Sequence, residues 1–422
     1  MQPKRKKVFV LVILLLVKAG FFLFYGIKDN FEIEIIREEG EEKEVREKEE
    51  EIKEDAATED EKNKNRKEDI RVELDSNIAG VSRYNRQIPG QIIECSYSLE
   101  GVPSPKAVSF SPDGLEIWAT SLMNKERGLF IFNAKTGKLK ENVYLDNGGG
   151  VEIVFNRDGS KGYVSQMETG TIFEIDTESK KILRRLRTES IWTKVVVLSN
   201  DERLLFASNW SGNDVSVIDL DSGVLLYNIP TVETPRGIYV TEDGNSLYVA
   251  GFKNGEIEVI DLNTKKSRII YRNGGAMRDI VGDEESGYLY ISDMANASIY
   301  RINIEKEKVE KFVDTDQNPN TIELTKENKV LIVSNRGINN RESYYLPGPE
   351  WGTLQFFNIK NGEILDAVVG GNQPTGLSVY QDSFIYSNFL DGSIVICDIP
   401  SYEDLIAGGG GASHFYKDFI EK

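Results

Sequence analysis

The chain has 422 residues, a formal net charge of −18, two Cys and a single His, His414. These numbers argue against nucleophile–His catalysis, against zinc sites built from His and Cys, and against binding to nucleic acid, which requires a basic face. The composition therefore gives no good indication of an enzyme, and it leaves a binding role as the expectation.

Residues 1–27 are expected to form a signal anchor. Basic residues at positions 4–7 precede an apolar run at 8–25 that only Lys18 and Gly20 interrupt. A run of about 18 residues is near the minimum for a membrane span, and the basic end should stay in the cytoplasm. The rest of the chain would then face the periplasm or the cell surface. The alternative is a cleaved signal peptide with its site at 17–19, which would make the protein secreted.

Residues 28–87 have the composition of a charged, largely disordered spacer. Positions 31–70 contain 18 Asp or Glu against 9 Lys or Arg, a balance of −9. So few apolar residues cannot bury a core. An acidic tail that binds a partner is the alternative to a spacer.

A repeat of about 42 residues organises positions 88–400. Each unit contains four short alternating runs rich in Val, Ile and Tyr, which is the pattern of β-strands. An Asp or Asn closes the third run of each unit, at steps of 43, 43, 42, 42, 55 and 40 residues along Asn133, Asp176, Asp219, Asp261, Asn303, Asn358 and Asp398. Seven such units predict an all-β fold, a seven-bladed β-propeller.

Ser-Asn pairs in the second run of several units carry a family resemblance. They stand at Ser208-Asn209, Ser334-Asn335 and Ser387-Asn388, with Ser292-Asp293 as a variant. The segments that contain these pairs resemble the Tyr-Val-Thr-Asn (YVTN) repeats of bacterial and archaeal surface-layer-type propellers. The resemblance covers about 88–400 and implies the propeller fold. It also implies that the loops from strand four to strand one, and from strand two to strand three, share one face.

The two ends of the repeat region are expected to share one blade. Residues 88–99 resemble a fourth strand, and the last unit lacks one because Pro400 follows Asp398 and Ile399 directly. A strand from the N-terminal side would complete the last blade and remove an open edge. Cys95 and Cys397 would then be neighbours, either joined by a disulfide or left as two buried thiols.

The C-terminal tail, residues 401–422, is predicted to be flexible. Four consecutive glycines at 408–411 support this interpretation. Aromatic residues that follow them offer a way for the tail to dock back on the ring.

Four of the seven residues that begin the first strands are basic. By the geometry that the resemblance implies, these residues surround one mouth of the axis, where they would focus an anion. The alternative is that they pair with Glu152, Asp279 and Glu323. The seven residues, here called the collar, are Lys106, Val151, Lys194, Arg236, Arg278, Asn320 and Thr375.

A second ring of residues lies two positions past the Ser of each Ser-Asn pair, or at the equivalent position of the other units. Six of its seven members are large and apolar. Exposed on the loop face, they would form an interaction patch, whereas packed between blades they would act as wedges. The seven are Met123, Met167, Trp210, Phe252, Met294, Arg336 and Phe389.

An insertion of about 12 residues lengthens a loop of the sixth unit, at 337–352. It contains Arg341, Tyr344, Tyr345 and Trp351, which are residue types enriched at interface anchors. Long loops on rigid scaffolds often carry function. We expect the insertion to bind a partner, and a lid packed on its own blade is the alternative.

One enzymatic alternative is a calcium-assisted lactonase, a chemistry that some propellers related by the resemblance carry. Its oxygen ligands would recur at one position around the ring, at Gln166, Asn209, Asp293, Asn335 and Asn388. Residues that end strands more commonly bond their own loop backbone, so no cofactor is expected. The leading function is a membrane-anchored, extracytoplasmic binding or scaffold module for a protein or a cell-envelope polymer.

Overall fold

The computed structural model of the protein describes residues 80–123, 127–146, 148–325 and 327–422. The expected anchor at 1–27 and most of the expected spacer at 28–87 lie outside these residues. Within them, no helix is long and apolar enough to span a membrane.

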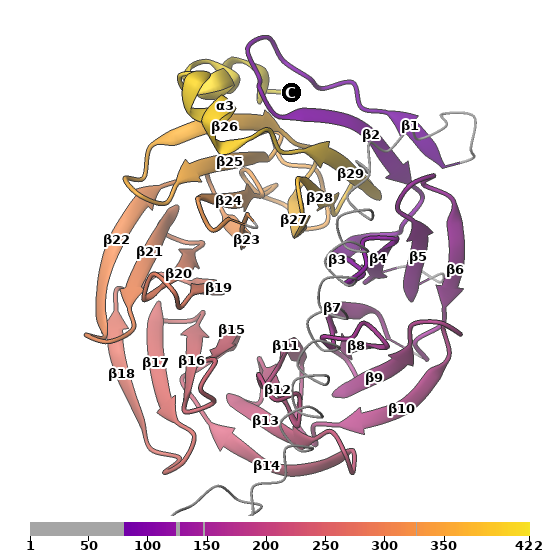
Figure 1. The fold of residues 1–422 in the computed structure, drawn as a ribbon, viewed down its shortest axis with the longest axis vertical. Helices are drawn as coiled ribbons and strands as arrows, with labels where there is room; N and C mark the ends of the chain where they lie inside the picture. Colours follow the sequence, from indigo (N-terminus) through magenta and orange to yellow (C-terminus); the bar gives the residue numbers. More distant parts are fainter. Residues whose placement is uncertain (1–79, 124–126, 147, 326) are drawn as a thin grey trace, which may run out of the picture. The chain divides into compact units, whose positions relative to one another are not determined.

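The described chain forms seven antiparallel sheets arranged as blades around an axis (Figure 1). Blades one to three consist of β3 (Pro105–Phe110), β4 (Glu116–Ser121), β5 (Leu129–Asn133), β6 (Leu139–Val143), β7 (Gly150–Phe155), β8 (Lys161–Gln166), β9 (Thr171–Asp176), β10 (Ile182–Arg187), β11 (Thr193–Leu198), β12 (Leu204–Asn209), β13 (Asp214–Asp219) and β14 (Val224–Pro230). Blades four to six consist of β15 (Pro235–Val240), β16 (Ser246–Gly251), β17 (Glu256–Asp261), β18 (Ser267–Arg272), β19 (Met277–Asp283), β20 (Tyr288–Asp293), β21 (Ser298–Asn303), β22 (Lys308–Asp314), β23 (Pro319–Leu324), β24 (Val330–Asn335), β25 (Thr353–Asn358) and β26 (Ile364–Val369). Blade seven consists of β27 (Pro374–Tyr380), β28 (Ser383–Asn388), β29 (Ser393–Asp398), β2 (Glu94–Glu100) and β1 (Val81–Arg83).

The seven innermost strands form a continuous ring around the axis. The innermost strand of each blade contacts the innermost strand of the next, and β27 contacts β3 in the same way. The prediction of a seven-bladed β-propeller is therefore confirmed.

Packing between neighbouring blades supplies the core. The second strands, such as β12 and β16, are buried over almost their whole length because adjacent blades cover both of their faces. Phe206 and Val217 of blade three, for example, pack with Ile238 and Leu247 of blade four. Outermost strands such as β14 alternate between exposed and partly buried residues, since only one face meets a neighbour.

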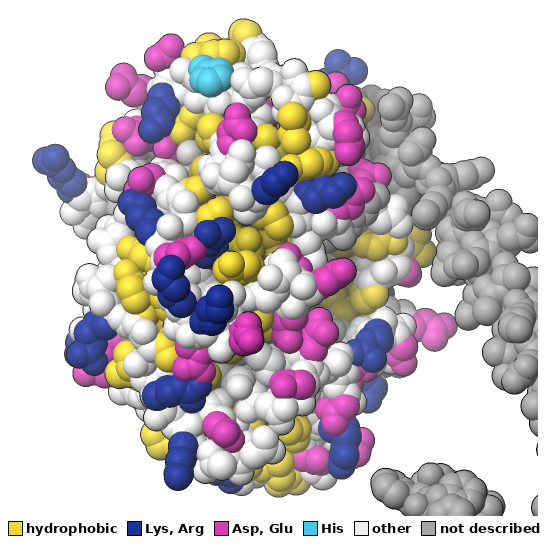
Figure 2. Space-filling model, turned by 60° about the vertical axis from the view of Figure 1, so that its left-hand side comes forward, with side chains coloured by type: hydrophobic (Ala, Val, Ile, Leu, Met, Phe, Trp, Pro, Cys, Tyr) yellow, Lys and Arg dark blue, Asp and Glu magenta, His cyan; other side chains and the backbone are white. Residues whose placement is uncertain are grey.

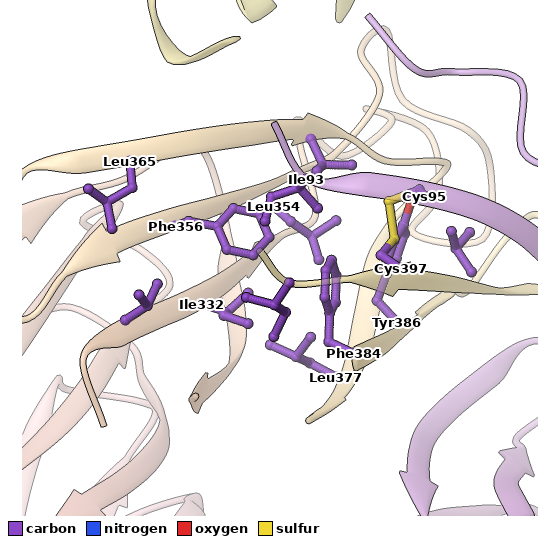
Figure 3. Packing of buried hydrophobic residues seen from close by; sticks show 14 of the residues in the cluster. Ile93, Cys95, Ile332, Leu354, Phe356, Leu365, Leu377, Phe384, Tyr386 and Cys397 are labelled. Carbon is purple, nitrogen blue, oxygen red and sulfur yellow. A yellow bond between two sulfur atoms is a disulfide. The ribbon is translucent and has the colours of Figure 1, made fainter. Parts of the chain in front are cut away.

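Blade seven is built from both ends of the repeat region (Figure 3). Strand β2 pairs with β29, and their register places Cys95 opposite Cys397, which form a disulfide. Of the two alternatives that the sequence left open, the structure has the disulfide. Strand β1 then adds a fifth strand, in which buried Val81 pairs with Leu99. Residues 80–87 are thus ordered, and the expected spacer ends earlier than predicted.

The C-terminal segment 401–422 is folded, and the prediction of a flexible tail is wrong. Helix α3 (Tyr402–Ala407) and the 3-10 turns η1 (Gly411–His414) and η2 (Tyr416–Phe419) pack against β26. The glycines permit close approach rather than flexibility, because a Cβ atom on Gly408 would collide with Ile92. Buried Tyr416 donates a hydrogen bond to Asp316 (2.8 Å).

A single buried carboxylate joins the two chain ends to blade six. Asp366 of β26 is fully buried and accepts hydrogen bonds from four backbone N–H groups. The donors are Ile92 (2.7 Å), Ile93 (2.8 Å), Ala367 (2.8 Å) and Ala412 (2.8 Å). The N-terminal strand region, β26 and the C-terminal segment therefore share one acceptor.

Charges are mixed on the face drawn in Figure 2. Basic and acidic side chains are interspersed there with apolar ones, and neither sign covers a broad area. This face does not show the continuous basic surface that nucleic-acid binding requires.

Candidate functional site

The collar residues occupy the second position of the innermost strand in every blade. In each blade, the pairing between this strand and the next shifts register close to that position, for example between Thr193 and Val196 and between Pro235 and Ile238. A register shift of this kind re-aims a side chain. The seven positions therefore share one end of the axis.

The Ser of the repeated Ser-Asn pairs holds the collar backbone in place. Ser208 accepts a hydrogen bond from the N–H of Val195 in its own blade (3.1 Å) and donates to the carbonyl oxygen of Arg236 in the next blade (2.7 Å). Ser292 makes the same pair of bonds, to Asp279 (3.1 Å) and Asn320 (2.9 Å). The repeated Ser thus links the bulged inner strands of adjacent blades.

Small residues leave room for the collar carbonyls. A Cβ atom on Gly237 would lie 2.8 Å from the carbonyl oxygen of Arg278, and one on Gly376 would lie 2.7 Å from that of Lys106. Both distances are too short for carbon against oxygen. The glycines at these two places are therefore required by the spacing of neighbouring blades.

Five cations meet at this end of the axis, because Arg336 from the second ring joins Lys106, Lys194, Arg236 and Arg278. Burial lowers the pKa of Lys106 well below its ordinary value, and repulsion from the other four cations lowers it further. Burial, with repulsion from Arg236 and Arg278, lowers the pKa of Lys194 to about 7. Burial, with repulsion from Arg236 and Arg336, lowers the pKa of Arg278 to about 9. The cations thus lie close enough to disturb one another.

The three carboxylates proposed as partners of the collar lie in an adjacent cavity. Glu152, Asp279 and Glu323 line an axial cavity of about 190 Å³, which Arg236 and Arg278 also border. Burial raises the pKa of Glu152 to about 7 and that of Glu323 to about 8. In the part of the chain that the structure describes, none of these carboxylates forms an ion pair with a collar cation.

The second ring is not uniformly exposed. Met123 is exposed, and Met167, Trp210, Phe252 and Met294 are half-buried. Phe389 and Arg336 are buried, so neither belongs to an exposed patch. Phe389 is covered because the rings of Tyr344 and Tyr345 lie over it, with centroids at 5.8 and 6.5 Å.

An aromatic arc, defined as Trp192, Trp210 and Phe252, flanks the collar at Lys194. The rings of Trp210 and Phe252 lie 4.7 Å apart, and the Lys194 ammonium lies 5.1 Å from the Trp192 ring and 5.6 Å from the Trp210 ring. Trp192 is 47% exposed and has a φ of 63°, a left-handed conformation that is uncommon for a bulky residue. Sequence analysis did not identify Trp192, although its position two residues before Lys194 was the available signal.

Part of the insertion lies over the collar. The guanidinium of Arg336 lies 4.2 Å from the centre of the Tyr344 ring, and Gln373 of the next blade donates a hydrogen bond to the carbonyl oxygen of Tyr344 (2.9 Å). Tyr345 contacts Tyr344 edge to face at 5.2 Å and remains exposed. The loop therefore spans two blades instead of packing on its own blade alone.

The other two predicted anchors of the insertion lie elsewhere. The ring of Trp351 lies near the cations of Arg86 (4.3 Å) and Lys422 (4.4 Å), and the backbone N–H of Trp351 donates to the carbonyl oxygen of Ile420 (2.8 Å). Trp351 thus fastens the C-terminal segment to the ring. Arg341 is exposed at the tip of the loop.

The residues considered for calcium are engaged within their own blades. Asn209 donates to Asp214 (2.6 Å) and Ser216 (2.8 Å), and Asp293 accepts from the N–H of Ala276 (2.8 Å). Gln166, Asn335 and Asn388 also bind their own loop or a neighbouring strand, although Oδ1 of Asn335 has no hydrogen-bond partner among the described residues. The described residues contain no group of three or more His, Cys, Asp or Glu side chains placed to hold a metal ion.

Comparison with known proteins supports the fold more than the function. No family model matches the chain. Antigen Lp49 of Leptospira interrogans serogroup Icterohaemorrhagiae serovar copenhageni (strain Fiocruz L1-130) is 28% identical over 256 residues, covering 58% of this chain and 56% of the antigen. The chain thus matches little more than half the length of that relative.

Two solved structures share the architecture. Hydrazine synthase of Kuenenia stuttgartiensis matches with a TM-score of 0.61 and 15% identity, covering 74% of this chain and 99% of that one. The β-propeller domain of Cps50 (Swd1) from Myceliophteria thermophila matches with a TM-score of 0.60 and 13% identity, covering 73% and 100%. Identities this low support the propeller fold alone.

Proposed function

We propose that this protein is a membrane-anchored, extracytoplasmic β-propeller of the YVTN-repeat type. We further propose that it binds a protein or a cell-envelope polymer through the face that carries the aromatic arc. The propeller fold is consistent with a binding or scaffold module. The observation that carries the choice of face is the exposed Trp192 beside the paired rings of Trp210 and Phe252. Trp is among the residue types enriched at binding hot spots.

The binding face is tested with alanine variants. We expect the double variant Trp192→Ala/Trp210→Ala, made in the full-length protein, to bind envelope fractions at least about tenfold more weakly than the wild type, since loss of hot-spot residues costs 2 kcal/mol or more. Membrane proteins and purified cell-wall polymer are assayed separately, which identifies the class of partner. The control is Leu226→Ala, which removes an equally exposed apolar side chain from the outer strand β14. Wild-type binding by the double variant would rule out this face.

The location is supported by the basic and apolar pattern of residues 1–27 and by the Cys95–Cys397 disulfide, because disulfides persist in oxidising compartments. A relative named as an antigen fits such a location. We expect the protein to stay with the membrane pellet after an alkaline carbonate wash, and to be digested when protease is added to cells whose outer layer has been opened. Release by the carbonate wash would contradict the anchor, and protection from protease would contradict the orientation.

A further inference from the structure

At this end of the axis five basic side chains lie near three carboxyl groups, those of Glu152, Asp279 and Glu323, and in the described part of the chain none of the three forms an ion pair with them. Amides instead of carboxylates position two of the arginines, Arg278 of the collar and Arg336 of the second ring. Arg278 donates through Nε to Oδ1 of Asn320, and Arg336 donates through Nη2 to Oε1 of Gln373. A neutral amide fixes the direction of a guanidinium but leaves its charge in place. Buried charges without a partner of opposite sign are costly, so this arrangement calls for an anion.

Hydrogen-bond donors at the collar also lack acceptors. Among the described residues, Arg236 Nη1, Arg336 Nε and Asn320 Nδ2 have no hydrogen-bond partner. Their side chains are well buried, because Arg236 is 6%, Arg336 3% and Asn320 0% exposed. Native proteins rarely leave buried polar groups unpaired, so each such group requires an explanation. All three of these atoms are donors, so one ligand rich in acceptor oxygens would satisfy them together.

The space at the collar is small. A cavity of about 20 Å³ is lined by Lys106, Arg236, Arg278 and Thr375 and by one carboxyl group, that of Glu152, whose pKa burial raises to about 7. Tyr344 lies over the neighbouring Arg336. This volume holds roughly one water molecule. Arg236 and Arg278 also border the axial cavity of about 190 Å³, so a compact anion held by these two arginines can extend into that larger space, whereas a polymer chain would not fit.

We propose that the collar binds a small free oxyanion of the phosphate, sulfate or carboxylate class. Arg236, Arg278 and Arg336 supply the charged N–H donors, which suit oxyanion geometry. Lys194 adds positive charge below about pH 7, and Lys106 and Asn320 Nδ2 add further N–H donors. This site adjoins the aromatic arc at Lys194, and its existence does not depend on the partner proposed above.

Thermal unfolding of the purified full-length protein tests the site, because a ligand that binds only the folded state raises Tm. Inorganic phosphate, sulfate and acetate are titrated as probes, with NaCl added to hold the ionic strength constant. We expect Tm to rise with the logarithm of the concentration of at least one of these oxyanions. The same Tm at all concentrations of all three would overturn the proposal.

Two single variants show whether the collar is the site. Arg236→Gln and Arg278→Gln should weaken oxyanion binding on the order of tenfold or more, since each removes charged hydrogen bonds. Neither should lower Tm in the absence of oxyanion, because each also relieves repulsion between buried cations. The matched control is Arg185→Gln, which removes an exposed arginine paired with Asp146 and should leave the oxyanion shift unchanged. A full shift in both collar variants would place the binding elsewhere and overturn the proposal.

The pH dependence of sulfate binding provides a readout that does not require a variant. Sulfate keeps its charge across the range, whereas Lys194 has a pKa of about 7 and is faced by Arg236, Arg278, Glu168 and Met167. As the pH rises from 6 to 8.5, Lys194 loses its positive charge and Glu152 and Glu323 gain negative charge, so sulfate should bind more tightly at pH 6 than at pH 8.5. Equal sulfate affinity at pH 6 and at pH 8.5 would contradict a role for Lys194. If the variant Trp192→Ala/Trp210→Ala kept the oxyanion-dependent rise in Tm, oxyanion binding would not require the two tryptophans of the binding face.

Discussion

Loss of the Cys95–Cys397 disulfide should lower the free energy of unfolding by up to roughly 5 kcal/mol, because the bond closes a loop with a sequence separation of 302. The bond also joins β2 to β29 in the blade that closes the ring. Without it, the two ends are held together by non-covalent contacts alone, which are the pairing of β2 with β29 and the packing of β27 against β3. We expect the variant Cys95→Ser/Cys397→Ser to unfold at a clearly lower denaturant concentration than the oxidised wild type.

Reduction of the wild type supplies the control for this variant. Dithiothreitol should bring the wild-type unfolding curve close to that of the double variant and should leave the variant itself unchanged. Identical curves for the variant and the oxidised wild type would mean that β2 closes the ring equally well without the bond.

Replacement of Asp366 by Ala should cost about 3 to 5 kcal/mol of stability, since it removes the acceptor of four buried backbone N–H groups. Those donors belong to the N-terminal region, to β26 and to the C-terminal segment. Chemical denaturation measures the loss. Limited proteolysis should also cut the C-terminal segment faster, because Ala412 no longer has its anchor on blade six.

A nearby surface carboxylate provides the comparison for this second experiment. Asp418 is exposed in the same C-terminal segment, and Asp418→Ala should change stability by no more than about 0.5 kcal/mol. If Asp366→Ala behaved like Asp418→Ala, the segment would be held by Tyr416 and Trp351 alone.

The regularity of the repeat explains why the fold was predictable. Asp or Asn ends the third strand in all seven units, so counting these residues counts the blades. Pro400 follows Asp398 after only Ile399, which leaves no room for a fourth strand in the last unit and indicates that another part of the chain must supply it. The fifth strand β1 escaped prediction because three residues are too few to show an alternating pattern.

The run of glycines explains why the C-terminal segment was wrongly predicted to be flexible. The same residue type is used where a chain is flexible and where two segments pack very closely, and the local sequence does not separate the two cases. At Gly408 and Gly411 the second case holds, because Ile92 and Asp366 lie against them. Both neighbours are distant in sequence, so only the folded chain reveals the contact.

The candidate site was predictable to the extent that it follows the repeat. The collar positions could be read from the start of each first strand, because the register of that strand is the same in all blades. The insertion has no counterpart in the other blades, so the sequence did not indicate that Tyr344 would cover Arg336 while Trp351 would fasten the C-terminal segment. Trp192 was missed although its left-handed conformation follows the repeat and recurs two positions before the collar residue at Ser104, Thr234, Asn318 and Gln373, none of which is apolar.

The position of the disulfide also determines how the ring would respond to mechanical load. A pull exerted through the residues before Gly80 would reach the ring at β1 and would peel β1 away from β2. The chain would then unravel through 84–93 and stop at Cys95, the second residue of β2, where a covalent bond to Cys397 carries the force. The ring itself would stay closed. A tethered protein with this arrangement can yield a short length of chain under tension without losing the surface that it presents.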